Sequence, residues 1–131
     1  MIFSLGQKLF LPEEWPSLRK SIHEMLDLSR TLYIRNKLVA FVVVNQLDSI
    51  DRCAFLSYCG VDPQYQGKGY GSKLLKETLA GIFQAGFHTI RLHVDDWNVD
   101  ARKLYERLGF HIIGNVQQSH VSCFLMEKVG N

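Results

Sequence analysis

One strand-helix-strand segment in the middle of the chain constrains the fold more than any other feature. The run Cys53 to Val61 mixes aromatic and apolar residues and ends at Asp62-Pro63, because proline cannot donate to a strand ladder and disfavours helix in the preceding residue. From Ser72 to Ala85 apolar residues recur at helical spacing, and Gly86 suits the left-handed position that closes a helix. Thr89 to Val94 then indicates a second strand. Two strands joined in this way are parallel and connected by a right-handed crossover.

Antiparallel hairpins are predicted on either side of this parallel unit. Asn36-Lys37 can turn between two β-rich arms, Leu32 to Arg35 and Leu38 to Asn45. The other expected elements are a first strand over Ile2 to Lys8, a helix over Glu13 to Leu28, a helix with an inner stripe from Ala101 to Leu108 that stops at Gly109, and strands over Phe110 to Gly114 and His120 to Glu127. The predicted fold class is therefore α/β (α+β), with a mixed, mainly antiparallel sheet and helices on both of its faces.

Length and charge limit both the number of domains and the class of partner. With 131 residues, 47% of them hydrophobic, the chain can bury one core without disulfide or metal staples. No linker-like stretch divides it, so residues 1–131 are expected to form a single domain. The net charge is only +2, and no run of Lys or Arg exceeds two residues. These features do not favour a nucleic-acid partner, whereas a small anionic ligand is compatible with them.

The cysteines and histidines indicate neither a metal centre nor a disulfide framework. Cys53, Cys59 and Cys123 are odd in number and lack the close paired spacing of zinc sites and redox motifs. The histidines form no i, i+4 pair. We therefore expect reduced thiols in a cytoplasmic protein and no metal. The amino-terminal residues lack the pattern of a secretion signal, and no apolar stretch approaches the length of a membrane span, so no membrane association is expected.

Three glycines lie where the central strand gives way to the helix: Gly67, Gly69 and Gly71. The first amides of a helix have no intrahelical acceptor and carry partial positive charge, so a phosphate group is stabilised there, and glycines leave its approach open. The spacing excludes two common phosphate loops, because Lys68 is not followed by Ser or Thr and because Gly-x-Gly-x-Gly differs from the dinucleotide fingerprint. On its own, such a loop could also be only a tight connection.

Two motifs flank the strand from Thr89 to Val94. The first is Gln66-x-x-Gly69-x-Gly71, preceded by Val61-x-Pro63, and the second is the segment from Asn98 to Phe110. They resemble the Arg/Gln-x-x-Gly-x-Gly/Ala and Asn-x-x-Ala-x-x-Leu-Tyr-x-x-x-Gly-Phe motifs of the GNAT superfamily of N-acetyltransferases. With the neighbouring strands, the resemblance covers residues 53–114. It implies acetyl-CoA as co-substrate, transfer of the acetyl group to a primary amine, and a central parallel strand pair that splays apart.

The resemblance places the co-substrate between those two parallel strands. Backbone groups of Cys59 and Val61 would bond the pantetheine arm, and the Cys59 amide would polarise the thioester carbonyl. Asn98 would also bond the pantetheine, or it could cap the free amides of the helix that it precedes. The residues that the resemblance assigns to acetyl-CoA are Cys59, Val61, Gln66, Gly67, Lys68, Gly69, Tyr70, Gly71, Ser72, Asn98, Arg102 and Tyr105.

Tyr105 and a base are the expected catalytic groups. By motif position Tyr105 would protonate the departing thiolate, although an aromatic residue on the inner face of a helix can also be simple packing. Many relatives carry a glutamate on the strand before the loop, but Ala54 to Gly60 contains no acid. Asp95 and Asp96 are the nearest candidates for the base, unless they are only solvated loop carboxylates. Behind them stand His93, His120 and Tyr58.

Three functional classes are compatible with these features. The first is an enzyme in which the amine attacks acetyl-CoA directly, since nothing in the sequence places a group to activate Cys59 as an acyl carrier. The second is a catalytically inactive module that binds coenzyme A. The third is a subunit or a homodimer paired through an exposed strand over Val121 to Met126. Only one helix is expected before the first hairpin, where many relatives have two, so the class of amine acceptor stays open.

Overall fold

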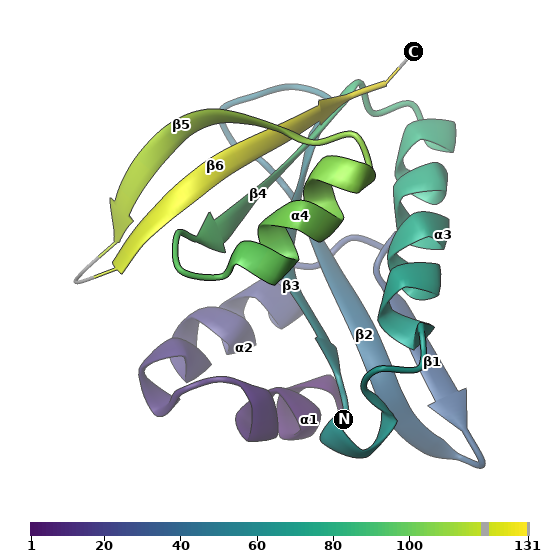
Figure 1. Cartoon of the computed structure of the whole chain (residues 1–131). Helices are drawn as coiled ribbons and strands as arrows, with labels where there is room; N and C mark the ends of the chain where they lie inside the picture. The colour runs from purple at the N-terminus through teal and green to yellow at the C-terminus, as the bar shows by residue number, and fades with distance from the viewer. Residues whose placement is uncertain (119–120, 131) are drawn as a thin grey trace.

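The structure is a computed structural model that describes residues 1–118 and 121–130. Its helices are α1 (Ile2–Leu9), α2 (Trp15–His23), α3 (Tyr70–Gln84) and α4 (Val99–Arg107), with short 3₁₀ turns at Pro12–Glu14 and Pro63–Tyr65. Its strands are β1 (Arg30–Ile34), β2 (Lys37–Gln46), β3 (Cys53–Val61), β4 (Thr89–Asp95), β5 (His111–Gln118) and β6 (Val121–Val129). The strands form one sheet in the order β1-β2-β3-β4-β6-β5 (Figure 1).

The sheet is mixed, which confirms the predicted fold class. β3 and β4 pair in parallel, whereas the other neighbouring strands pair in antiparallel fashion. α3 and α4 pack on one face of the sheet through the larger hydrophobic cluster, and α1 packs on the other face with α2 beside it (Figure 1). The predicted bounds of β3 agree with the structure, and β4 and α3 differ from prediction by only one or two residues at their ends.

β2 lies at the centre of the core because both of its faces are covered. Every residue from Leu38 to Val44 is buried. Phe41 and Val43 pack in the cluster beneath α1, whereas Val42 belongs to the larger cluster beneath α3 and α4. A strand buried on both faces carries a continuous apolar run rather than an alternating pattern. β2 therefore gives the neighbouring strand β3 a rigid support.

The amino-terminal segment is helical, so the first strand predicted over Ile2 to Lys8 is wrong. Ile2 and Leu5 are buried at helical spacing against the sheet. Gly6 allows α1 to lie close to α2, because a Cβ atom at this position would collide with the side chain of Leu18. An apolar segment this short fits the helix period and the strand period alike, and tertiary packing decides between them. Two helices therefore precede the first hairpin, and the prediction of only one is also wrong.

Two boundaries near the hairpin differ from prediction. The helix predicted over Glu13 to Leu28 ends at His23, because the chain turns and Leu26 donates its amide to a carbonyl of β2 at 2.8 Å. The hairpin turns at Arg35 and Asn36, whose φ angles are 51° and 64°. Two central residues with positive φ are typical of the tight hairpin turn whose twist matches the strands. The turn therefore lies one residue before the predicted position.

β6 lies inside the sheet, between β4 and β5. The expectation that Val121 to Met126 forms an exposed edge is therefore wrong, because both edges of this strand are already paired. The hairpin folds β6 back into the sheet and leaves β5 outermost. β1 and β5 are the edge strands of the sheet formed by the described residues.

Candidate active site

A β-bulge interrupts β3 next to the middle of the sheet. On β2, the adjacent residues Val43 and Val44 pair with Tyr58 and Leu56, so Ser57 is an extra residue on β3. A bulge of this kind reverses the alternation of side chains between the two faces of a sheet. Leu56 accordingly packs with the cluster beneath α3 and α4, whereas Tyr58, two residues later, packs with the cluster beneath α1.

The parallel pairing of β3 with β4 ends at this bulge. The last pair joins Leu56 to Leu92, although β3 runs on to Val61 and β4 to Asp95. Beyond the last pair the two strands diverge, and their facing edges have no ladder between them. The structure thus contains the splayed parallel pair that the sequence resemblance implied.

Backbone groups of Cys59 and Val61 point into the space between the strands. The Asp62 amide donates to the Val39 carbonyl at 2.7 Å, which makes the adjacent pair of Val61 and Ala40 one that exchanges no direct hydrogen bonds. Pairs with and without direct hydrogen bonds alternate along an antiparallel ladder. The pair of Cys59 and Val42, two positions away, therefore also exchanges no direct hydrogen bonds. The amides and carbonyls of both residues therefore face away from β2 and toward β4. The Val61 carbonyl accepts a hydrogen bond from the Gln66 side chain at 2.9 Å, and the backbone amide of Val61 faces the gap.

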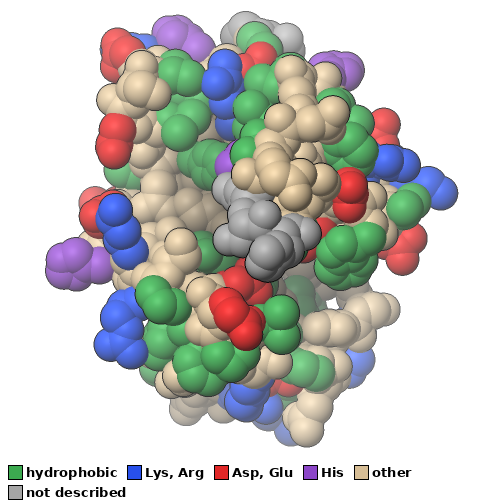
Figure 2. Space-filling view, turned by 90° about the vertical axis from the view of Figure 1, so that its left-hand side faces the viewer, with side chains coloured by type: hydrophobic (Ala, Val, Ile, Leu, Met, Phe, Trp, Pro, Cys, Tyr) green, Lys and Arg blue, Asp and Glu red, His purple; other side chains and the backbone are tan. Residues whose placement is uncertain are grey.

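The gap opens into a groove of about 620 Å³. Its walls come from the splayed parts of β3 and β4, the start of α4, the end of β2 and one side of α2. Figure 2 shows the side of the molecule on which α2 lies, and acidic and basic side chains are both scattered over it. The residues of the groove used below are Glu14, Ser17, Ser21, Asn45, Gln46, Phe55, Ser57, Tyr58, Cys59, His93, Asp95, Asn98 and Tyr105.

The glycine-rich loop leads from β3 to an uncapped end of α3. Gly67 and Gly69 have φ angles of 77° and 85°, which favour glycine strongly, and a Cβ at either position would meet no atom within 4 Å. Gly71 serves a different purpose, because a Cβ there would lie 3.0 Å from the Val61 side chain. The first helical bond runs from Lys73 to Gly69, and no side chain caps the helix. The amides before Lys73 are left without helical acceptors at the positive end of the helix dipole.

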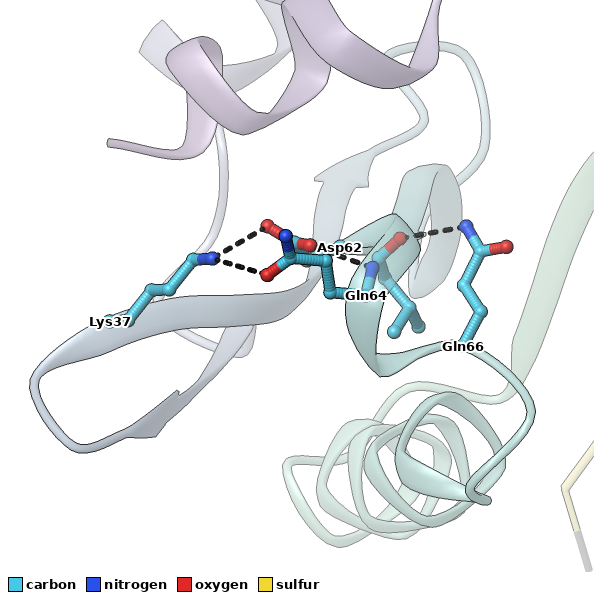
Figure 3. A network of polar contacts seen from close by, with 5 residues as sticks. Lys37, Asp62, Gln64 and Gln66 are labelled. Atoms are coloured by element: carbon cyan, nitrogen blue, oxygen red, sulfur yellow. Dashed lines mark hydrogen bonds and ion pairs between the residues drawn. The ribbon is translucent and has the colours of Figure 1, made fainter.

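A polar network holds the start of this loop in place (Figure 3). Asp62 is buried, and its carboxylate accepts a hydrogen bond from the Gln64 amide at 3.0 Å. The ammonium group of Lys37, on the β1–β2 hairpin, lies 3.5 Å from both Asp62 Oδ2 and Gln64 Oε1. The Gln64 hydrogen bond lowers the pKa of Asp62 below its ordinary value, and the positive charge of Lys37 acts in the same direction. Together with the Gln66 bond to β3, these contacts define the path of the loop.

Tyr105 projects from α4 to the splayed part of β3. Its hydroxyl oxygen lies 3.4 Å from the sulfur of Cys59, and its ring packs edge-on against Phe110 at 5.8 Å between centroids. The nearby Cys59 charge raises the pKa of Tyr105 far above the ordinary tyrosine value, and burial acts in the same direction. Cys59 is exposed when the whole residue is considered, but its thiol group lies against Tyr105. Burial of this thiol raises the pKa of Cys59. Tyr105 therefore keeps its proton throughout the neutral pH range.

Asn98 caps α4, as one of its two predicted roles requires. Its side-chain oxygen accepts a hydrogen bond from the Ala101 amide at 3.2 Å, and the residue also lines the groove. Arg102 points elsewhere: its guanidinium lies 3.6 Å from Glu106 and 5.5 Å above the Phe124 ring. The structure therefore brings Asn98 to the groove but not Arg102.

The candidate bases differ in where they lie. Asp95 lines the groove and accepts a hydrogen bond from the Cys123 thiol at 3.3 Å, whereas Asp96 is exposed and does not line it. Burial raises the pKa of Cys123 to about 11, and the Asp95 hydrogen bond acts in the same direction. His93 lines the groove on β4 and meets the Phe55 ring edge-on at 5.1 Å. His120 lies outside the described residues.

Tyr58 and His93 stand on the α2 side of the groove. His93 alternates along β4 with the buried Leu92 and Val94, which face α3 and α4. Burial lowers the pKa of His93 below its ordinary value, so its imidazole is neutral at pH 7. Burial raises the pKa of Tyr58, and a hydrogen bond with Ser17 acts in the opposite direction.

Sequence patterns missed the polar residues between α2 and the bulge. Ser57 donates a hydrogen bond to the side-chain oxygen of Asn45, and the Asn45 amide donates to the backbone carbonyl of Ser21 at 3.0 Å. Nothing in the local sequence marks these residues, because their meeting depends on the register of β2 against β3 and on the position of the bulge.

The fold and these residues agree with a known family. The family model described as the acetyltransferase (GNAT) family matches residues 6–110. The chain belongs to this family. The family resemblance of the two sequence motifs is therefore confirmed.

Individual relatives match parts of the chain. The thialysine N-epsilon-acetyltransferase of Bos taurus is 36% identical over 76 residues, which make up 58% of this chain and 44% of the relative. The [ribosomal protein bS18]-alanine N-acetyltransferase of Haemophilus ducreyi is 34% identical over 79 residues, or 60% of this chain and 52% of the relative. The chain thus spans about half the length of these relatives.

Solved structures share the fold over most of the chain. The ribosomal-protein-S18-alanine N-acetyltransferase from Escherichia coli has a TM-score of 0.76 at 24% identity, covering 88% of this chain and 76% of that one. Ard1 from Thermoplasma volcanium has a TM-score of 0.81 at 18% identity, covering 96% and 86%. At these identities the likeness shows the fold alone.

Two further observations concern metals and membranes. Among residues 1–118 and 121–130, no group of three or more His, Cys, Asp or Glu side chains is placed to hold a metal ion. Within the same residues, no helix has the length and apolar character that crossing a membrane requires.

Proposed function

We propose that this protein transfers an acetyl group from acetyl-CoA to a primary amine by direct attack of the amine on the thioester. The observation that supports this most combines three features: the open edge of β3 at Cys59, the uncapped start of α3, and the Tyr105 hydroxyl, the first and last of which meet in one groove. They would hold the acyl group, the phosphates and the leaving sulfur, respectively.

The described residues fit acetyl-CoA. The glycine-rich loop and the first amides of α3 would bind the pyrophosphate, because they present free donors at the positive end of a helix dipole. The pantetheine arm would run between β3 and β4 and bond the backbone groups of Cys59 and the backbone amide of Val61, which face this gap. The residues assigned to these contacts are Cys59, Val61, Gly67, Lys68, Gly69, Tyr70, Gly71, Ser72 and Asn98; Gln66 acts by holding the loop to β3.

The reaction requires two charge changes that residues of the groove would stabilise. When the amine nitrogen bonds to the thioester carbon, negative charge develops on the carbonyl oxygen, and the Cys59 amide would donate to it. The carbon–sulfur bond then breaks, and Tyr105 would give its proton to the departing sulfur. The product is an acetylated amine together with coenzyme A.

His93 is the proposed base among the candidates. Its imidazole is neutral at pH 7 and faces the α2 side of the groove, so it can accept the amine proton directly or through water. Asp95 also lines the groove, but its carboxylate already accepts a hydrogen bond from the Cys123 thiol. Asp96 is exposed outside the groove and is not favoured for this role.

The acceptor would enter along α2. This wall carries Ser17 and Ser21, with Glu14 just before the helix, and His93 faces it from β4. It mixes carboxylate and hydroxyl groups, which suits a polar primary amine. The names of the relatives given above refer to thialysine and to an alanine of a ribosomal protein, so both kinds of amine belong among the acceptors to be tested. The free cysteines support a reducing, cytoplasmic compartment.

The test is the release of coenzyme A from acetyl-CoA in the presence of thialysine, lysine, spermidine and a short peptide that begins with alanine. Calorimetry with acetyl-CoA provides the binding constant in parallel. Turnover with one of these amines is the expected result. Binding without turnover on any amine would favour an inactive module that binds coenzyme A, which the lack of an acid on β3 between Ala54 and Gly60 makes the second candidate. Absence of binding would reject both.

A further inference from the structure

Asn45 connects three parts of the groove that lie far apart in the sequence. Its Oδ1 accepts a hydrogen bond from Ser57 Oγ, and its Nδ2 donates to the Ser21 carbonyl at 3.0 Å. Ser57 is the extra residue of the β3 bulge, and Ser21 lies in the last turn of α2. All three residues line the groove. One side-chain amide therefore ties the helix on the acceptor side to the strand that carries Cys59.

The bond to Ser21 satisfies a carbonyl that α2 itself leaves free. The last carbonyls of a helix lack intrahelical donors and need a partner from elsewhere. Of the amides that follow Ser21 in the chain, Glu24 donates to the Lys20 carbonyl at 3.0 Å and Met25 to the Ile22 carbonyl at 3.4 Å, so neither reaches the Ser21 carbonyl. Asn45 thus supplies the donor that the helix end lacks. Because this donor sits on β2, the bond also fixes the end of α2 against the sheet.

The bond to Ser57 holds the residue on which the geometry of β3 depends. Because of the bulge, Tyr58 faces α1 while Cys59 lies on the α4 side, where it reaches Tyr105. The pairing with β4 also ends here. A bulged residue has no partner in the ladder, so a side-chain bond from Ser57 to the neighbouring strand stabilises this arrangement.

We propose that Asn45 is a positioning residue for acetyl transfer. It sets α2, the wall along which the amine would lie, at a defined position relative to the Cys59 amide that would hold the thioester. This proposal rests on the proposed function. It predicts that losing the Asn45 side chain impairs use of the acceptor, whereas acetyl-CoA, which binds through β3, the loop and α3, is held as before.

The kinetic test uses Asn45→Ala, Asn45→Asp and Ser57→Ala. Asp can still accept from Ser57, but it would place an oxygen against the Ser21 carbonyl, so this variant breaks the α2 bond alone. Gln46→Ala is the matched control, since Gln46 follows on β2, also lines the groove and makes neither bond. With the amine from the panel that gives the fastest turnover, kcat/KM is expected to fall about 10- to 100-fold in both Asn45 variants. The acetyl-CoA dissociation constant should stay unchanged, as should all values for Gln46→Ala.

A second readout does not depend on turnover. Hydrogen exchange of the Glu24 and Met25 amides is measured for the natural sequence and for Ser57→Ala. If Asn45 transmits position between the bulge and α2, removing the Ser57 hydroxyl on β3 speeds exchange in the last turn of α2. Unchanged exchange there would overturn the proposal, and so would a parallel loss of acetyl-CoA affinity and acceptor use in Asn45→Ala. Absence of turnover in the natural protein would reject the proposed function instead, and the exchange result would still decide the role of Asn45.

Discussion

The sulfur of Cys59 lies 3.4 Å from the hydroxyl oxygen of Tyr105, although 46 positions separate them in the chain. The contact exists because the bulge at Ser57 turns Cys59 toward α4, and because α4 begins where β4 has already diverged from β3. It joins the strand edge proposed for the thioester to the group proposed as its acid. Tests of the account therefore begin with this pair.

Replacing Cys59 with alanine should lower the pKa of Tyr105. The charge of the Cys59 thiolate disfavours a second negative charge on the phenol, so its removal lets the phenolate form at lower pH, nearer the ordinary value of about 10. Absorbance titration of the phenolate measures this shift, with Tyr105→Phe identifying which tyrosine moves. Because a general acid must carry its proton, the alkaline limb of kcat should move to lower pH in Cys59→Ala. An unchanged Tyr105 titration would show that the two groups are not coupled.

Replacing Gly69 with alanine should weaken both the fold and acetyl-CoA binding. Gly69 has a φ of 85°, where a Cβ costs about 1 kcal/mol, and the added methyl would project into the open space before α3. Urea unfolding and calorimetry provide the two values. Gly114→Ala is the control, because a Cβ there also meets no atom within 4 Å but the backbone has no positive φ. Equal behaviour of the two variants would contradict the assigned role of the loop.

Activity should fall as the pH drops through the pKa of His93. Burial lowers this pKa below the ordinary histidine value of 6.5, so the neutral imidazole that can accept a proton persists to lower pH than in a free histidine. The acid limb of kcat/KM for the amine is therefore expected below pH 6.5, and His93→Gln should abolish that limb and reduce the rate about 100-fold. Asp96→Asn, which changes a carboxylate outside the groove, should leave the profile unchanged. The reverse result would transfer the role of base to Asp96.

The same burial of His93 makes folding stability depend on pH. The folded protein binds the proton less readily than the unfolded chain, so the contribution of His93 is present above its unfolded pKa and is lost as the pH falls below it. The unfolding temperatures of the natural sequence and of His93→Gln, measured from roughly pH 5 to 8, should converge toward the acid end of this range. A constant difference across this range would mean that His93 titrates alike in both states.

The sequence predicted the parts of the fold that are determined locally. The segment from Cys53 to Gly109 contains the residues that end or begin its own helices and strands. Pro63 follows β3, the glycines precede α3, and Gly86 and Gly109, each with a φ of 99°, follow the ends of α3 and α4. The Tyr105 assignment followed from the same segment by motif position. The function of these residues stays a prediction until the variants are measured.

Features that depend on contacts between distant segments could not be predicted in this way. The apolar residues around Ile2 and Leu5 fit either period, and only packing against β2 makes the segment helical. The place of β6 between β4 and β5 is a property of the whole sheet. The Asn45 contacts depend on the register of β2 against β3, which a single strand does not encode.

The most direct test of the central claim is the response of backbone amide resonances to coenzyme A and acetyl-CoA. The largest changes are expected on the amides of Cys59 and Val61, in the gap between β3 and β4, and on the loop residues 67–72, with Cys59 distinguishing the acetylated from the free form. Changes confined to other parts of the molecule, or no changes with either compound, would contradict the placement of the co-substrate and the proposed reaction with it.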